Sequence, residues 1–356
     1  MAGTGVQTGI RRRRPMPVPI PTDLGTSSDP KKIQQQLVDL KTYLTMLHSV
    51  TARIDDELSK RMNEMLFSGV AADRPAAATQ DRLYVATGAP ATLSFDTGTA
   101  WLLVGRPPHG QGYFRRSTAT ACLFEPYDGN VVLINGAFQE VPDAGVSFGT
   151  GGLAASTVYN AYVYMSGSTM TGEFSATAHA LQAATGIRIK SGDATRTLVG
   201  KVRTDGSTQF VDSVTQRFAI SWFNRQPKSL GLFLPADRTT ASASFVELSS
   251  ADRLEAVVWG DAAIPAWASG SVEHTVATTS IFTAIGLDGT GTISYGRHGV
   301  QPPALGAKMP MACVGVFSPA EGYRFVTLLG ATGAATATWT GTDIGSACGL
   351  TALVWG

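Results

Sequence analysis

One stretch of the sequence matches the pattern around the nucleophile of many hydrolases. Residues 145–149 read GVSFG, which places Ser147 at the centre of a Gly-x-Ser-x-Gly motif. That motif activates its serine only at a sharp turn between a strand and a helix. The residues that follow, TGGLAAS and then a strand-like run, contain no helical pattern. We therefore predict a glycine-rich turn. The same holds for the overlapping GTGGLA (149–154), because no βαβ unit surrounds this partial dinucleotide-binding fingerprint.

Histidines and carboxylates give no closer match to a catalytic or metal site. The histidines show no HxH or HExxH spacing: His48, His109, His179, His274 and His298. One histidine per chain could ligate a metal on a threefold axis, but the solvated flank of a helix is the favoured place for His48. Hydrolysis of a glycan needs two carboxylates about 5–9 Å apart. The candidates are Asp261, Glu273, Asp288 and Glu321, and their spacing brings no two together. We predict no catalytic residue, metal or cofactor.

The composition favours a β-rich protein built from small residues. The 356 residues are 44% hydrophobic and only 15% charged, and 39 of them are glycine. A net charge of +1 creates no general attraction for nucleic acid or anionic membranes. The cysteines Cys122, Cys313 and Cys348 lie in apolar contexts, which favours buried free thiols and synthesis in a reducing cytoplasm. Because no secretory signal and no run of about 18 apolar residues occurs, we expect no membrane insertion.

The first 28 residues form a basic, proline-rich segment. Four arginines precede alternating prolines, and the residues that we assign to anchoring are Arg11, Arg12, Arg13, Arg14, Pro15, Pro17 and Pro19. Such prolines favour an extended arm without a core of its own. We expect this arm to become ordered by docking on an acidic protein surface. A solvated charge run is the next alternative, and contact with nucleic acid or a membrane is the least favoured.

Residues 29–68 have the spacing of a coiled-coil helix. Asp29 is a good N-cap and Pro30 suits the first helical position. Apolar residues then alternate steps of four and three, interrupted only by Thr51 and Arg61. The predicted trimerisation residues are Ile33, Leu37, Leu40, Leu44, Leu47, Ile54, Leu58 and Met65. Leucine at the a positions, with isoleucine or leucine at d, favours more than two chains, so we predict a parallel homotrimer. The alternative is one amphipathic helix packed on its own β-domain.

Beyond this helix the sequence predicts short strands. Residues 69–105 contain three candidate strands at 83–86, 91–95 and 100–104, and we predict a β-hairpin neck completed by threefold repetition. Residues 106–228 continue as a middle β domain. The polar stretch NRQPKS (224–229) predicts a boundary, after which strands recur about every ten residues to the C-terminus. We predict a C-terminal β-sandwich or jelly-roll knob over residues 229–356.

The neck sequence RLYVATGAPATLSFDTGTAW resembles a segment of tailed-bacteriophage fibre and spike proteins. The similarity is carried by Arg82, Leu83, Tyr84, Ala86, Thr87, Gly88, Leu93, Asp96, Gly98, Thr99, Ala100 and Trp101. Here GAPAT replaces a plain Asp-Thr-Gly turn. Residues 186–225 are also similar to a module in phage structural proteins. The resemblance implies interlocking hairpins in a homotrimeric virion fibre or spike, synthesised in the host bacterial cytoplasm.

The order of the parts agrees with this resemblance and suggests the partners. A basic arm, a coiled coil, a β-neck and a knob would attach the fibre by residues 1–28 to a portal, collar, capsid or tail protein. The knob would then contact a host-surface glycan or protein. The candidate receptor contacts are Tyr295, Arg297, His298 and Tyr323. Two alternatives are a tail-spike glycan hydrolase or esterase with a site between subunits, and a structural collar or decoration fibre that binds no receptor.

Overall fold

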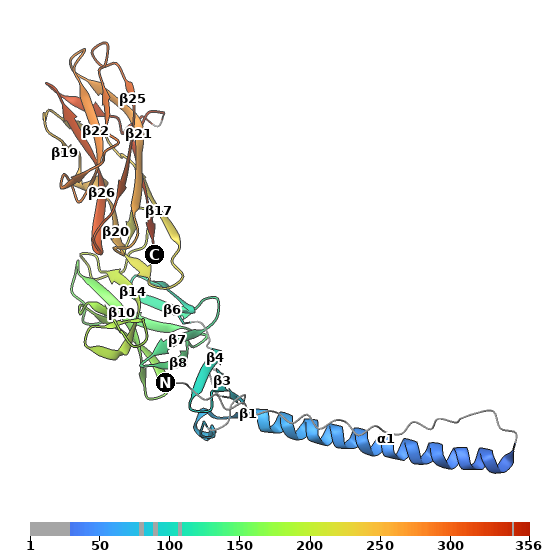
Figure 1. Ribbon diagram of the computed structural model, residues 1–356. Helices are drawn as coiled ribbons and strands as arrows, with labels where there is room; N and C mark the ends of the chain where they lie inside the picture. Colours follow the sequence, from blue (N-terminus) through green and yellow to red (C-terminus); the bar gives the residue numbers. More distant parts are fainter. Residues whose placement is uncertain (1–28, 78–81, 88–91, 106–108, 344) are drawn as a thin grey trace, which may run out of the picture. The chain divides into compact units, whose positions relative to one another are not determined.

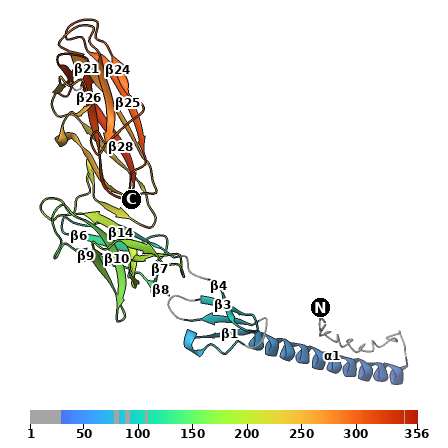
Figure 2. The ribbon, with the colours of Figure 1, turned by 60° about the vertical axis from the view of Figure 1, so that its left-hand side comes forward.

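The computed structural model describes residues 29–77, 82–87, 92–105, 109–343 and 345–356. The predicted arm, residues 1–28, lies outside the described residues. As predicted, the chain is mainly β, and its described part contains one α-helix close to the N-terminus (Figures 1 and 2). The chain divides into two compact units, Met1–Arg106 and Pro107–Gly356. Each unit is described by itself.

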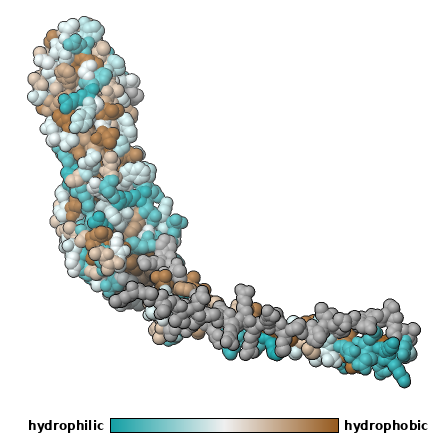
Figure 3. All heavy atoms as spheres, viewed as in Figure 1, coloured by the Kyte–Doolittle hydropathy of each residue, from teal (hydrophilic) through white to brown (hydrophobic). Residues whose placement is uncertain are grey.

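Helix α1, Pro30–Met65, has 36 residues and begins as the sequence indicates. The side chain of Asp29 accepts a hydrogen bond from the Lys31 N–H at 3.0 Å, and Pro30 occupies the first turn. At about 1.5 Å per residue the helix is about 54 Å long. Figure 3 shows hydrophilic residues gathered at its beginning and hydrophobic residues further along. No helix among the described residues is both long and apolar enough to cross a membrane.

The first unit also contains a four-stranded sheet, here called the neck sheet. Its strands lie in the order β1 Leu66–Gly69, β2 Leu83–Ala86, β3 Thr92–Asp96 and β4 Trp101–Gly105. Strands β2 to β4 match the three predicted strands, but β1 was not predicted. The helix ends at Met65, three residues before the predicted limit, because residues 66–69 instead pair in parallel with β2. The single chain therefore contains one more neck strand than the sequence indicated.

One face of the neck sheet is closed by buried polar and aromatic side chains. Tyr84 and Ser94 are almost inaccessible, and the fully buried carboxylate of Asp96 forms an ion pair with Arg82. The indole N–H of Trp101 donates to the carbonyl of Pro75 at 2.8 Å, which holds the segment after the 3-10 turn η1 (Ala71–Asp73) over this face. These contacts give the short strands a packed side within one chain.

The N-terminal part of the second unit is built from three sheets around an aromatic core. The largest contains β11 Thr169–Ser175, β10 Val158–Ser166, β14 Asp193–Arg203, β13 Arg188–Lys190, β12 His179–Leu181 and β16 Ala219–Ser221. The others contain β5 Gly112–Arg116, β6 Ala121–Pro126 and β9 Val146–Gly149, and the pair β7 Val131–Ile134 and β8 Ala137–Glu140. Phe148 of β9 packs edge-on against Phe114 of β5, with ring centroids 5.4 Å apart, and at a tilt against Phe174 of β11, with centroids 5.2 Å apart. Aromatic rings thus join two of the sheets.

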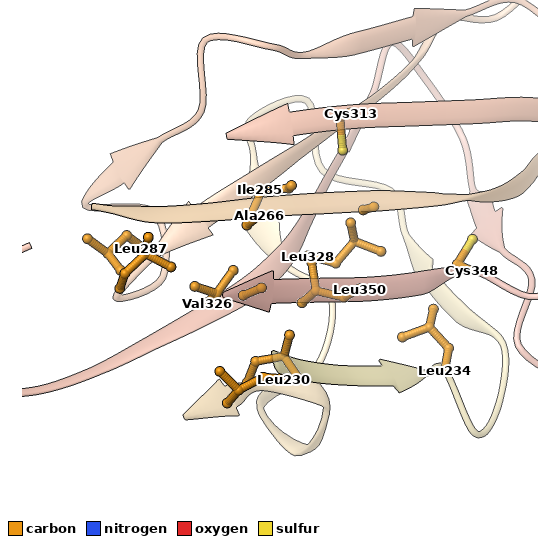
Figure 4. Packing of buried hydrophobic residues seen from close by; sticks show 14 of the residues in the cluster. Leu230, Leu234, Ala266, Ile285, Leu287, Cys313, Val326, Leu328, Cys348 and Leu350 are labelled. Carbon is orange, nitrogen blue, oxygen red and sulfur yellow. The ribbon is translucent and has the colours of Figure 1, made fainter. Parts of the chain in front are cut away.

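The C-terminal part consists of two sheets that enclose a common core, as expected for a β-sandwich. The first sheet contains β17 Pro227–Phe233, β28 Gly349–Trp355, β21 Ile264–His274, β25 Met309–Phe317, β27 Ala337–Trp339 and β18 Arg238–Thr240. The second contains β15 Gln216–Arg217, β20 Leu254–Val258, β26 Gly322–Thr332, β22 Ile281–Leu287, β23 Thr292–Ile293, β19 Val246–Glu247 and β24 His298–Val300. The 3-10 turn η2 spans Ser250–Asp252. Figure 4 shows Leu230 and Leu350 from the first sheet packed with Leu328 from the second.

The predicted boundary between residues 228 and 229 falls inside a strand. β17 pairs over its full length with the final strand β28, from Pro227 opposite Trp355 to Phe233 opposite Gly349. A proline is tolerated as the first residue of an edge strand, because no ladder hydrogen bond requires its N–H. The short strand β15, from the preceding segment, also pairs with β20 of the sandwich. Residues on both sides of the predicted boundary therefore belong to one compact unit.

Gly270 provides a test of this packing. Its φ of +151° is uncommon for other residues, and a Cβ there would lie 2.4 Å from the Cα of Cys348. We expect Gly270→Ala to lower the free energy of unfolding by about 2–4 kcal/mol through backbone strain and overpacking. Gly149→Ala is the control, because no atom lies within 4 Å of its Cβ position; we expect a change within about 0.5 kcal/mol. Denaturant unfolding at one protein concentration measures both, and equal stabilities would contradict the close packing at Gly270.

Candidate functional site

The apolar stripe predicted on the helix is present as an exposed surface. Its exposed members range from 39% accessible for Leu47 to 60% for Leu37, while Leu40 is half-buried. Among the described elements, β1, which directly continues the helix, makes the main contact with α1. A shallow hollow on this stripe is lined by Leu37, Leu40, Lys41, Leu44, Thr45 and His48. Large exposed apolar surfaces of this kind mark interaction sites.

Thr51 interrupts the stripe without adding an unsatisfied polar group. Its hydroxyl donates to the carbonyl of His48 at 2.8 Å and also lies 3.2 Å from that of Leu47. A threonine that bonds to its own helix in this way can enter an apolar interface without losing a hydrogen bond to water. His48 is exposed beside it. The stripe is thus compatible with burial along this part of the helix.

The four candidate receptor residues do not form one surface. Tyr295 is fully exposed, and the guanidinium of nearby Arg297 lies 5.4 Å from the ring of Phe245. His298 is half-buried in β24, and its Nε2 has no hydrogen-bond partner among the described residues. Tyr323 differs from the sequence expectation of an exposed loop residue, because it is half-buried in strand β26.

The surroundings of Tyr323 explain its burial. Its hydroxyl donates to the carboxylate of Glu255, and Arg203 of β14 stacks on its ring at 4.1 Å. Burial, together with the bond to Glu255, raises the pKa of Tyr323 well above its ordinary value of 10.0. Tyr323 therefore joins the sandwich to the part of the unit that precedes it. Among the candidate contacts, only Tyr295 has a side chain entirely open to a partner.

A charged and aromatic cluster, missed by sequence reasoning, lies where these two parts of the second unit meet. We call it the junction cluster; it comprises His179, Lys201, Trp222, Trp259 and Glu321. The Nε2–H of His179 donates to Glu321 Oε1 at 2.9 Å, and the buried ammonium of Lys201 pairs with the same oxygen. The ammonium also lies 4.9 Å from the ring of Trp259, which packs edge-on against Trp222 at 4.9 Å. These residues come from five separate segments, so no local pattern reveals them.

The junction cluster has the electrostatics of a structural contact. Burial disfavours the ionised form of Glu321, but the hydrogen bonds from His179 and Lys201 outweigh this and lower its pKa to about 2. The carboxylate is therefore ionised and engaged at neutral pH, which makes it a poor general acid or base. Nearby, Arg225 pairs with Asp261 at 2.6 Å and stacks on Trp222 at 4.5 Å. The cluster holds together residues more than 100 positions apart.

The sequence motifs with a possible catalytic meaning lie in ordinary structural positions. Ser147 lies in strand β9 opposite Leu123, with a turn rather than a helix after the strand. The candidate carboxylates Asp261, Asp288 and Glu321 each form an ion pair with a basic side chain. Within the described ranges, no group of three or more His, Cys, Asp or Glu residues is placed to hold a metal ion. The three cysteines are buried and free.

The sequence matches no known protein family and no curated protein. Among solved structures, the chain is similar to that of the infectious bursal disease virus Gx strain, with 12% identity over 76% of this chain and 71% of that chain, and a TM-score of 0.22. The infectious bursal disease virus VP2 subviral particle is 13% identical over 78% of this chain and 70% of that chain, with a TM-score of 0.21. The Bacillus thuringiensis insecticidal delta-endotoxin Cry8Ea1 is 9% identical over 71% of this chain and 54% of that chain, with a TM-score of 0.24. TM-scores this far below 0.5 carry no argument about fold or function.

Glu321→Gln tests the junction cluster. The amide keeps the shape of the side chain but leaves the Lys201 ammonium buried opposite a neutral group. We expect a loss of about 1–3 kcal/mol in unfolding free energy at pH 7, a value reduced by the partial exposure of Glu321. Because the folded-state pKa is lowered from 4.5 to about 2, this stabilisation is present above pH 4.5 and is lost as the pH falls towards 2.

Thermal unfolding at a series of pH values measures this difference between the two proteins. Glu140→Gln, an exposed residue of β8, is the control and should change the melting temperature little at any pH. A deficit of Glu321→Gln that stays constant down to pH 2 would contradict the assigned role of the ionised carboxylate.

Proposed function

We propose that this chain is a homotrimeric fibre or spike protein of a tailed-bacteriophage virion. The observation that carries the proposal is the apolar heptad stripe of α1, which remains exposed along a 36-residue helix. Residues 1–28 would attach the protein to a portal, collar, capsid or tail component, and the C-terminal sandwich would contact a host-surface glycan or protein. The protein would be made in the host bacterial cytoplasm and then reside in the virion.

The side chains of the stripe support three parallel chains rather than two. Leucine occupies a positions such as Leu37, Leu44 and Leu58, which disfavours the packing of a two-stranded coiled coil. Val50 and Met62 flank the seam and widen its apolar surface. Met62 is 59% exposed in the single chain, so this wider surface would also be covered in a trimer.

The neck sheet supports a continuation of the same contact beyond the helix. Leu66, Leu83, Phe95 and Leu102 lie side by side across its four strands. Three of them are exposed, with Leu66 and Leu102 more than half accessible. They share the face opposite the buried Tyr84 and Asp96, because alternate residues of a strand point to opposite sides. Copies of this apolar face would meet in the interlocked neck that the resemblance implies.

We propose a binding and structural role rather than catalysis. The positions of Ser147 and of the paired carboxylates support this choice, as does the exposed surface of Tyr295. We propose no cofactor, no nucleic-acid partner and no membrane insertion. Incubating the purified protein with host surface polysaccharide discriminates the rival class, since release of oligosaccharides would require a glycan hydrolase. An antibody bound to the sandwich surface tests the other alternative. If particles still adsorb normally to host cells, a structural collar fibre is favoured instead.

A charge in the middle of the stripe should dissociate the protein. Leu44→Asp would place three carboxylates in the apolar seam, and burying each without a partner costs several kcal/mol. We expect light scattering at micromolar concentration to change from three chains to one. Ser49→Asp introduces the same charge on the opposite side of the helix and should leave three chains. If light scattering gives the mass of a single chain for the unmodified protein, the proposed function is contradicted.

Deleting residues 1–28 tests the anchoring role separately. We expect the shortened protein to remain trimeric, because the helix and its cap at Asp29 are intact, and to be absent from assembled particles. Immunoblots of purified particles measure incorporation. Replacing Arg11, Arg12, Arg13 and Arg14 by glutamine is the finer variant, with an expected reduction of about tenfold or more if charge pairing dominates the docking. Normal incorporation of the deletion variant would refute the anchor.

A further inference from the structure

One outer face of the sandwich lacks charged side chains over the width of four strands. The outward positions of β17, β28, β25 and the first half of β21 are occupied by Pro227, Ser229, Gly231, Phe233, Gly349, Thr351, Leu353, Trp355, Pro265, Trp267, Ser269, Pro310, Ala312, Val314 and Val316. Further along β21 the outward residues are the buried Ser271 and the charged Glu273, which lies beyond this area, opposite Thr338 of β27. We call this surface the uncharged face. Surfaces of soluble domains contain about 25–35% charged residues, so an area of this size without any is unusual.

Charged residues gather around the uncharged face instead of on it. The Arg225–Asp261 pair lies beside Val316 and Trp355 at one end, in a hollow that these residues share. The Lys308–Asp343 pair, at 3.0 Å, lies beyond Ser271 and Pro310 at the other end. On the opposite outer face of the sandwich, Glu247 pairs with Arg253, whose guanidinium lies 3.8 Å from the ring of Phe325. A polar rim around an apolar centre is the composition of a protein interface.

The uncharged face is large enough for an interface between proteins. Its most exposed apolar residues are Phe233 at 74%, Val316 at 71%, Val314 at 52%, Trp267 at 47% and Trp355 at 40%. Aromatic side chains offer about 150–250 Å² each, so these five residues present on the order of 500 Å². Stable interfaces bury about 800 Å² per partner. With its smaller outward residues added, the face approaches that size.

Part of the face is hollowed into a groove of about 440 Å³ between Phe233 and Trp267. Glycines form part of its floor, and the ring of Phe233 covers Gly349 so closely that a Cβ there would lie 3.2 Å from it. Two aromatic walls could stack on a sugar ring. However, the apolar surface continues beyond the groove over Val314, Val316 and Trp355, whose one group able to bond a sugar hydroxyl is the indole N–H of Trp355. The observations therefore favour a protein partner.

We propose that the uncharged face is covered by the other copies of this chain in the trimer. This inference rests on the proposed function, since the helices would bring the three sandwiches to a high local concentration. The three sandwiches could then associate through a buried area near the lower limit for stable protein interfaces, because their association is intramolecular once the coiled coil has formed. A freely exposed face of this composition would make the protein prone to aggregate. Tyr295, next to the Gly296–Val314 bridge, would remain at the edge for an external ligand.

Thiol labelling of the full chain tests the covering of this face. Val316→Cys places a thiol on the uncharged face, whereas Leu305→Cys places one in the loop 301–308, at almost the same exposure in the single chain, 71% against 70%. The natural cysteines give little background, because burial raises the pKa of Cys313 to about 12 and that of Cys348 to about 11. Ala312→Cys is the second variant on the face, should Val316→Cys fold poorly.

We expect an uncharged maleimide to label Val316→Cys at least tenfold more slowly than Leu305→Cys in the intact protein. Light scattering on the same samples measures the number of chains per particle, and so shows whether a negative result contradicts this inference alone or also the proposed trimer. Three chains with equal labelling rates would overturn this inference and leave the proposed function standing, whereas a single-chain mass would overturn both. If Val316→Cys is labelled rapidly at first and becomes slow only when dextran oligosaccharides are added, the face binds a glycan. That result would also overturn the covering by other copies.

Discussion

Apolar surface that one chain leaves uncovered is the constraint on which the rest of this structure depends. Helix α1 exposes to solvent most of the apolar side chains of its stripe, between Ile33 and Met65. Each large aliphatic side chain that moves out of water contributes about 1.5–3 kcal/mol. In proteins, most of the stability of a helix comes from packing of its apolar face rather than from the helix propensity of its residues. A cover for the stripe would therefore stabilise the helix, and in the proposed trimer other copies of the chain would supply one at every heptad.

Charged side chains are used in the opposite way, to fix elements that come from distant segments. Arg82 and Asp96 join two neck strands, while Lys201 and Glu321 join the sandwich to the sheets that precede it. Pairs with at least one buried partner add little net stability compared with apolar packing, but they penalise wrong arrangements, because a displaced partner leaves a buried charge without compensation. The junction cluster therefore makes the second unit one body. The uncharged face, in contrast, has no charged side chains that would have to be desolvated when a partner covers it.

The sequence predicted those features that depend on local periodicity. The heptad spacing located α1 to within a few residues, and alternation located strands such as β2, β22 and β28. It failed where pairing between distant segments decides the structure. Strand β1 exists because Leu66 pairs with Leu83, and β17 because Leu230 pairs with Ala352, whereas the proline at 227 and the polar residues around it resemble a linker. The junction cluster and the uncharged face combine residues from separate strands, so only the fold reveals them.

The two apolar surfaces differ in a way that suggests an order of assembly. The stripe of α1 is contiguous in sequence, so it forms as soon as one helix forms, and in the proposed trimer its contacts would repeat at every heptad. The uncharged face exists only after β17, β21, β25 and β28, which span residues 227–355, have paired into one sheet. Non-local pairing of this kind is slow. Helices that associate early would hold three unfinished sandwiches together, and each face would then meet its partner at high local concentration as soon as it formed.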